Sequence, residues 1–162
     1  MMEAGLRGLT EGPGERREEG PEKGPGLKER APEGKEGDAP LLIAVTQLTS
    51  TSQETMNDEL LIDGKIEDVV TKYAENARKA GLAGVVCSPL EAGLIHEHVG
   101  QSFLTVTPGV RFADSDVGDQ ARVTTPERAR ELGSDYIVVG RPITKADDPV
   151  LAYEKCVFGF LG

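Results

Sequence analysis

The sequence predicts an α/β fold, because four short apolar runs rich in β-branched residues alternate with segments of helical spacing. Continuous apolar strands that alternate with helices are typical of a parallel sheet covered by helices. Four such units make half of a closed barrel of eight β/α units. The predicted strands are 41–48, 84–88, 103–107 and 136–139, and the predicted helices are 67–80, 89–98, 126–132 and 149–160.

Local signals support the boundaries of these elements. Helix 67–80 carries apolar residues at helical spacing and is followed by Gly81, which is typical of a helix C-terminus. Thr125 and Asp148 each stand directly before a proline. Because threonine and aspartate favour the N-cap and proline favours the first helical position, both residues are predicted to begin a helix.

The segment 11–39 differs in composition from the rest of the chain. Its one large apolar residue is Leu27, and glycine, proline, glutamate, lysine and arginine make up most of the remainder. Such a segment buries too little apolar surface to offset the entropy lost on ordering. We therefore expect 11–39 to be a disordered, low-complexity insertion.

Charge and composition exclude several classes of function. The 162-residue chain has a net charge of −10, whereas nucleic-acid binding needs clustered basic residues. The longest purely apolar run, 41–45, is too short to span a membrane. Cys87 and Cys156 occur without a secretory leader pattern, which favours two thiols in the reducing cytoplasm over a disulfide framework.

Polar residues at the ends of the predicted strands suggest anion binding. In parallel barrels, functional side chains lie at the carboxyl ends of strands. Arginine offers a fixed fork of donors to phosphate, glutamine offers neutral amide donors, and glycine allows close approach of the backbone. The candidates at these exits are Thr49, Arg111, Gln120, Gly140 and Arg141.

Each candidate also has a purely structural alternative. Thr49 could serve as a loop or capping hydroxyl, and Arg111 could form a surface ion pair with an aspartate of its own loop. Gln120 could be an ordinary exposed amide. Gly140 and Arg141 could form a structural turn.

Four sequence blocks, in this order, resemble the bacterial orotidine 5′-phosphate decarboxylase family: LLIAVTQLTSTS (41–52), DELLI (58–62), GVVCSPLEA (84–92) and the region from FLTVTPGVR to GSDYIVVGRPIT (103–144). The resemblance implies a partial (β/α)8 TIM barrel that contains strands five to eight with their helices. Residues 1–10 resemble the helix after strand four, so the chain is expected to begin in the middle of the barrel. Residues 40–162 would form its C-terminal half.

The resemblance also implies a function. Members of this family are carboxy-lyases that convert orotidine 5′-monophosphate (OMP) to UMP and CO2 in pyrimidine biosynthesis, and they need no cofactor. It implies that Thr49 contacts the pyrimidine, while Arg111, Gln120, Gly140 and Arg141 bind the phosphate. The expected partner is a small nucleotide, with no nucleic acid and no membrane. The full-length family is expected to be homodimeric, and a half-barrel is expected to self-associate or aggregate.

The catalytic block of the family is missing. The resemblance implies an Asp-x-Lys-x-x-Asp array at the exit of strand three and a lysine after strand two, on strands that this chain lacks. The segment Asp63–Asp68 fits the same spacing but leads into helix 67–80, where Asp63 or Asp68 is expected to cap the helix or to favour its first turn. No residue of this chain is therefore predicted to be catalytic.

Two interpretations of the function are compatible with the sequence. The chain is either the binding half of an enzyme whose other half lies elsewhere or in a second chain, or a catalytically inactive nucleotide-binding remnant. A different phosphate-binding barrel would share the loop positions but not the LTSTS and DELLI blocks.

His96 and His98 are two residues apart and do not share a helix face, so no metal site is predicted. Cys87 is expected to be a buried thiol.

Overall fold

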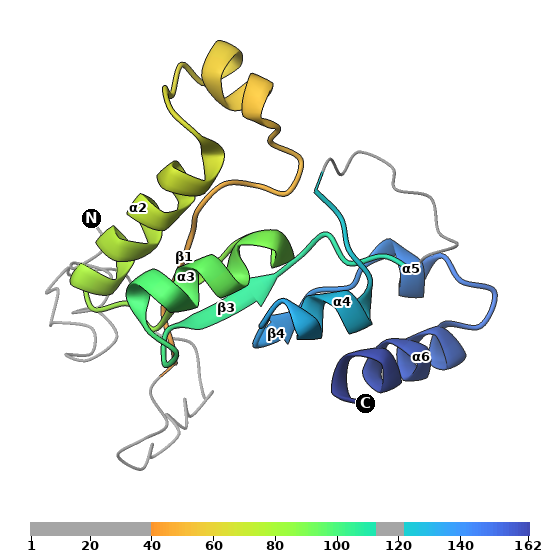
Figure 1. Ribbon diagram of the computed structural model, residues 1–162. Helices are drawn as coiled ribbons and strands as arrows, with labels where there is room; N and C mark the ends of the chain where they lie inside the picture. The colour runs from red at the N-terminus through yellow and green to blue at the C-terminus, as the bar shows by residue number, and fades with distance from the viewer. Residues whose placement is uncertain (1–39, 113–121) are drawn as a thin grey trace, which may run out of the picture.

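The computed structural model of the protein describes residues 40–112 and 122–162. The predictions for 1–10 and 11–39 lie outside the described residues. The described part contains a four-stranded parallel sheet in the order β1-β2-β3-β4 (Figure 1). Its strands are β1 (Ile43–Val45), β2 (Gly84–Val86), β3 (Leu104–Thr107) and β4 (Tyr136–Ile137). The sequential order of parallel strands is that of half a β/α barrel, as predicted.

The four predicted helices are present with small shifts at their ends. They are α2 (Ile66–Lys79), the 3-10 turn η2 (Pro89–Glu91) continued by α3 (Ala92–Val99), α4 (Pro126–Glu131) and α6 (Pro149–Leu161). The predicted N-caps are confirmed: Thr125 accepts a hydrogen bond from the backbone N–H of Arg128, and Asp148 accepts two from the first turn of α6. No helix in the described ranges is long and apolar enough to cross a membrane.

Two short helical segments were not predicted. The π-helical turn η1 (Thr55–Glu59) follows β1, and α5 (Arg141–Thr144) follows β4. The strands are also shorter than predicted, because the chain leaves the sheet early at both ends of 41–48 and after Ile137. The residues released after β1 and after β4 belong to the loops that carry the candidate site.

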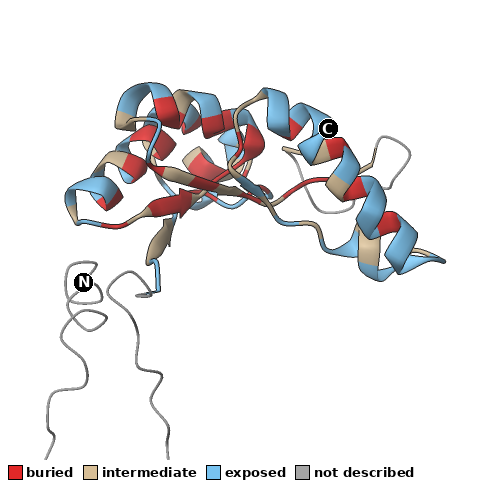
Figure 2. Ribbon diagram, turned by 90° about the horizontal axis from the view of Figure 1, so that it is seen from below, coloured by how far each residue is buried: buried red, intermediate tan, exposed pale blue. Residues whose placement is uncertain are grey.

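The hydrophobic core lies between the sheet and the helices on one of its sides. Helices α2, α3 and α4 cover this side, and α6 packs on α4 near β4 (Figure 2). Phe103, Ile95 and Val85 are fully buried between these layers. The rest of the core cluster consists of Met56, Ile66, Val70, Ala74, Ala77, Leu82 and Cys87.

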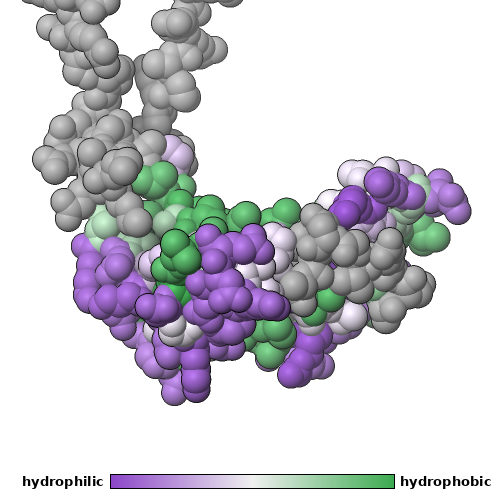
Figure 3. All heavy atoms as spheres, turned by 90° about the horizontal axis from the view of Figure 1, so that it is seen from above, coloured by the Kyte–Doolittle hydropathy of each residue, from purple (hydrophilic) through white to green (hydrophobic). Residues whose placement is uncertain are grey.

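The other side of the sheet is open. Val45 pairs in register with Val86, Val86 with Val106, and Val106 with Tyr136, so one apolar row crosses all four strands. None of the four is buried, and Val45 and Tyr136 are 56% and 57% exposed. Figure 3 shows apolar side chains along this hollowed side of the molecule. A closed barrel fills such a face with side chains from all of its strands.

Candidate functional site

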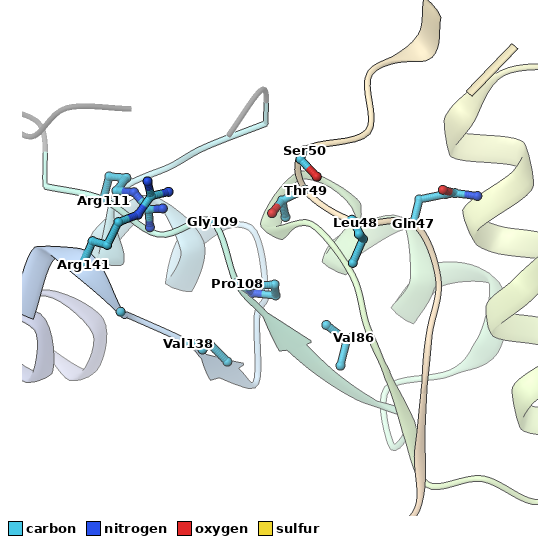
Figure 4. A pocket seen from close by; sticks show the side chains of 11 residues that line it. Gln47, Leu48, Thr49, Ser50, Val86, Pro108, Gly109, Arg111, Val138 and Arg141 are labelled. Atoms are coloured by element: carbon cyan, nitrogen blue, oxygen red, sulfur yellow. The ribbon is translucent and has the colours of Figure 1, made fainter. Parts of the chain in front are cut away.

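A cavity of about 380 Å³ lies at the carboxyl ends of the four strands (Figure 4). This volume is within the usual range for small-molecule sites. The cavity brings together four of the five candidate residues from the sequence, namely Thr49, Arg111, Gly140 and Arg141. Gln120, the fifth, lies outside the described residues. The remaining lining residues are Gln47, Leu48, Ser50, Val86, Pro108, Gly109 and Val138.

Two arginines occupy one end of the cavity. Arg111 follows β3 and Arg141 begins α5, and Figure 4 shows their guanidinium groups at the same end. Arg111 is 9% exposed, its Nη1 donates to the carbonyl oxygen of Val110 at 2.7 Å, and its Nε finds no hydrogen-bond partner among the described residues. A buried guanidinium with an unsatisfied donor beside a second arginine can hold an anion with several acceptor oxygens.

Gly140 lies next to the arginines and leaves space beside its backbone. A Cβ added at Gly140 would meet no atom of the described structure within 4 Å. Its carbonyl oxygen accepts hydrogen bonds from the N–H groups of Ile143 and Thr144, which fixes the turn from β4 into α5. The turn therefore has a structural role and also leaves room for a ligand atom to approach the backbone.

Thr49 lies at the other end of the cavity, across Gly109 from the arginines (Figure 4). Its side chain is 5% exposed. Gly109 has a φ of +84°, and an added Cβ would lie 3.1 Å from Thr49 Cγ2. Glycine is thus required at 109 both for its backbone conformation and for the close packing of Thr49.

Arg122 is a residue of this region that the sequence analysis missed. It forms an ion pair with Glu91, and the two side chains are 13% and 3% exposed. Its Nη2 also donates to the carbonyl oxygen of Leu48 at 2.9 Å. Burial lowers the pKa of the Arg122 guanidinium from its ordinary value. No local sequence pattern distinguishes this arginine from a solvated one, because its partners come from distant parts of the chain.

The segment Asp63–Asp68 does not form a charged array in a pocket. Asp63, Lys65 and Asp68 are exposed, and none of them lines the cavity. Asp68 lies in the first turn of α2, as predicted. The N-cap of α2 is Lys65, so the alternative expectation that Asp63 caps the helix is wrong.

The histidines have separate structural roles. His96 Nε2 lies 3.1 Å from both the carbonyl oxygen of Phe103 and Oδ2 of Asp135, whereas His98 Nδ1 lies 3.0 Å from the carbonyl oxygen of Leu94. Within the described ranges, no group of three or more histidine, cysteine, aspartate or glutamate residues is placed to hold a metal ion.

Cys87 is a buried thiol, as predicted. It is 1% exposed at the end of β2, beside the core. Burial raises its pKa from the usual 9.0 to about 12, although the nearby positive charge of Arg122 partly opposes the shift. A neutral thiol of this kind is a poor nucleophile.

The fold and the cavity define a β/α-barrel protein with a cationic site at the carboxyl ends of its strands. Comparison with known proteins identifies the group: the chain belongs to the orotidine 5′-phosphate decarboxylase / HUMPS family, whose model matches residues 19–156. The sequence resemblance to this family is therefore confirmed.

The chain spans about half the length of the relatives that it matches. Orotidine 5′-phosphate decarboxylase from Bacillus cytotoxicus is 56% identical over 129 residues, which are 80% of this chain and 53% of that protein. The solved structure of orotidine 5′-phosphate decarboxylase from Lactobacillus acidophilus is 43% identical, with a TM-score of 0.64, over 76% of this chain and 50% of its own. An uncharacterized conserved protein from Geobacillus kaustophilus is 38% identical, with a TM-score of 0.67, over 99% of this chain and 58% of its own. The described fold is thus part of a TIM barrel.

Proposed function

We propose that this chain supplies the nucleotide-binding half of an orotidine 5′-phosphate decarboxylase, which converts OMP to UMP and CO2. In this proposal Arg111, Gln120, Gly140 and Arg141 bind the phosphate and Thr49 contacts the pyrimidine. The observation that carries it is the cavity at the strand ends, which has two arginines at one end and a buried threonine at the other. A nucleoside monophosphate has the same polarity, with its anion at one end and its base at the other.

Phosphate binding would contribute to the chemical step as well as to affinity. Interactions with a remote, non-reacting group can be used to stabilise the transition state at the reacting centre. Arg111 supports this role because its side chain is held against the loop by the carbonyl oxygen of Val110. A charged donor that is already oriented loses little entropy when it binds an anion.

The chemical step itself would need residues from the complementary half of the barrel. In the one segment of the described ranges with the Asp-x-Lys-x-x-Asp spacing, the charged residues are exposed and do not line the cavity. We therefore propose that the chain alone has no decarboxylase activity. The alternative, an inactive nucleotide-binding remnant, differs only in whether a complementary half restores turnover.

The open face of the sheet favours a macromolecular partner. The exposed apolar row on β1 to β4 would be covered either by a complementary half-barrel or by self-association of this chain. The two free and buried thiols, Cys87 and Cys156, support a reducing cytoplasm as the location.

Calorimetric titration of the chain with UMP tests the binding proposal, and uridine, which lacks the phosphate, is the matched control. We expect UMP to bind and uridine to bind at least tenfold more weakly. Equal affinities would exclude a phosphate site at the arginines.

A second experiment separates the split enzyme from the remnant. The part of the Bacillus cytotoxicus relative that this chain does not span is added in trans, and OMP turnover is followed spectrophotometrically. Turnover that appears only in the mixture supports the enzyme half. A folded mixture without turnover favours the remnant.

A further inference from the structure

Arg122 connects the exits of three strands. Its backbone N–H donates to the carbonyl oxygen of Thr49 at 3.2 Å, and its Nη2 donates to the carbonyl oxygen of Leu48 at 2.9 Å, so it holds the loop after β1. Its guanidinium also pairs with Glu91, in the turn after β2. Arg122 itself belongs to the connection that follows β3.

Glu91 is held rigidly at the β2 exit. Its second oxygen, Oε2, accepts a 2.9 Å hydrogen bond from the backbone N–H of Ser88, and the two residues form a capping box. Glu91 is the carboxylate that forms an ion pair with the buried guanidinium of Arg122, and removal of either partner would leave the other charge buried and unpaired.

The same connection also holds Arg111. Thr124, two residues after Arg122, accepts a 2.9 Å hydrogen bond from the Arg111 N–H and donates a 3.3 Å bond to the carbonyl oxygen of Gly109. Arg122 thus begins a short stretch of chain that touches the Thr49 loop on one side and the Arg111 loop on the other.

We infer that Arg122, through its ion pair with Glu91, is a positioning residue that fixes Thr49 relative to Arg111. The inference rests on the proposed nucleotide-binding function and deepens it: Arg122 does not line the cavity, but it keeps the base-contacting and phosphate-contacting ends of the site at a constant separation. Loss of Arg122 would leave phosphate recognition largely intact while uncoupling it from recognition of the base.

The test compares UMP with ribose 5-phosphate, which has the phosphate but no base. For Arg122→Met we expect UMP affinity to fall at least tenfold and ribose 5-phosphate affinity to change less than threefold. Arg122→Lys keeps the charge beside Glu91 and should recover part of the loss. Arg141→Ala, in contrast, should weaken both ligands alike, and so should any general loss of folding. Equal losses of both ligands in Arg122→Met would overturn the inference.

A double-mutant cycle tests whether the ion pair carries the effect. Glu91→Gln keeps an acceptor for Ser88 but removes the charge, so we expect it to reproduce the selective loss of UMP affinity. The double variant with Arg122→Met should be no weaker than either single variant, because the two residues act as one unit. Additive losses would contradict this.

Hydrogen exchange of the ligand-free chain gives a readout that does not depend on nucleotide binding. Arg122→Met should accelerate amide exchange at least tenfold in 46–52, which the Arg122 side chain holds, with little change in 109–112, β2 and β3, because Thr124 still holds the Arg111 loop. Unchanged exchange in 46–52 would refute the positioning role even if the parent binds UMP. If the parent binds neither ligand, the proposed function fails, and this measurement still decides whether Arg122 holds the loop after β1.

Discussion

The side chain of Thr49 packs directly against Gly109. A Cβ added at Gly109 would lie 3.1 Å from Thr49 Cγ2 and 3.2 Å from the carbonyl oxygen of Arg122. The loop after β1 and the loop after β3 therefore meet with no space for a methyl group. Thr49 and Arg111, at the two ends of the cavity, belong to these two loops.

Gly109→Ala should damage both stability and nucleotide binding, whereas Gly100→Ala should affect stability alone. Both glycines have positive φ, +84° and +114°, so alanine brings backbone strain of roughly 1–3 kcal/mol at either position. Only at Gly109 would the new methyl group also displace Thr49, because nothing lies within 4 Å of a Cβ at Gly100. Urea unfolding and UMP titration of both variants provide the measurement. Equal UMP affinity in the two variants would show that the Thr49 contact is not needed.

Arg141→Ala should weaken UMP binding about tenfold to a hundredfold. Charge-assisted hydrogen bonds contribute about 1.5–3 kcal/mol, which corresponds to this range. Arg128→Ala is a matched control, because Arg128 lies on α4, pairs with Glu131 and does not line the cavity. Calorimetry that finds the same UMP affinity for Arg141→Ala as for Arg128→Ala would remove Arg141 from the site.

The sequence was sufficient to predict the order and type of the main elements, since these depend on local patterns. Apolar runs and helical spacing are visible in the chain itself, and so are the caps at Thr125 and Asp148. The short segments η1 and α5 could not be found in this way, because five and four residues are too few to show a helical repeat.

Part of the candidate site could also be predicted from the sequence, because several of its residues follow predicted strands. Thr49, Arg111, Gly140 and Arg141 follow strands, and parallel strands end at one edge of the sheet, so their meeting in one cavity follows from topology. Arg122 gave no such signal. Its importance arises from contacts with Leu48 and Glu91, which become neighbours only when the loops have folded.

The purified chain should show no measurable OMP decarboxylase activity, and Lys65→Ala should change nothing. Lys65 is exposed at the start of α2 and lies outside the cavity, so its charge cannot act on a bound pyrimidine. Turnover is measured by the change in ultraviolet absorbance of OMP. Activity that survives Lys65→Ala would refute the need for a complementary half. Activity that is lost with Lys65 would instead identify Asp63–Asp68 as a catalytic segment.

Cys87 should make the stability of the chain fall at alkaline pH. Its pKa is about 12 in the folded chain against 9.0 for an ordinary thiol, so between these values the folded state keeps a proton that the unfolded state has lost. The stabilisation is complete below pH 9 and is lost as the pH rises toward 12. Between pH 8 and 10 the free energy of unfolding should fall by about 1 kcal/mol more in the parent than in Cys87→Ala. Urea unfolding at both pH values measures the difference, and parallel losses would show that Cys87 ionises normally.

The open sheet face should prevent the chain from behaving as a well-ordered monomer. Val45 and Val138 are 56% and 49% exposed on this face, and both β1 and β4 are edge strands within the described sheet. Exposed apolar surface costs about 25 cal/mol per Å², and unpaired strand edges favour pairing with another chain. We therefore expect self-association or partial loss of tertiary packing at micromolar concentration, as measured by sedimentation and thermal unfolding.

Surface substitutions test whether self-association depends on the open face of the sheet. The double variant Val45→Lys/Val138→Lys places charges on the open face and should shift sedimentation toward the monomer. Tyr73→Lys places a charge on α2, the helix that packs on β1 and β2 from the covered side of the sheet, and should leave association unchanged, because Tyr73 is already 37% exposed on that helix. Addition of the complementary half of the Bacillus cytotoxicus relative should sharpen thermal unfolding, since it would cover the apolar row. A parent chain that sediments as a monodisperse monomer and unfolds cooperatively would show that four β/α units suffice, and the open face would then need no partner.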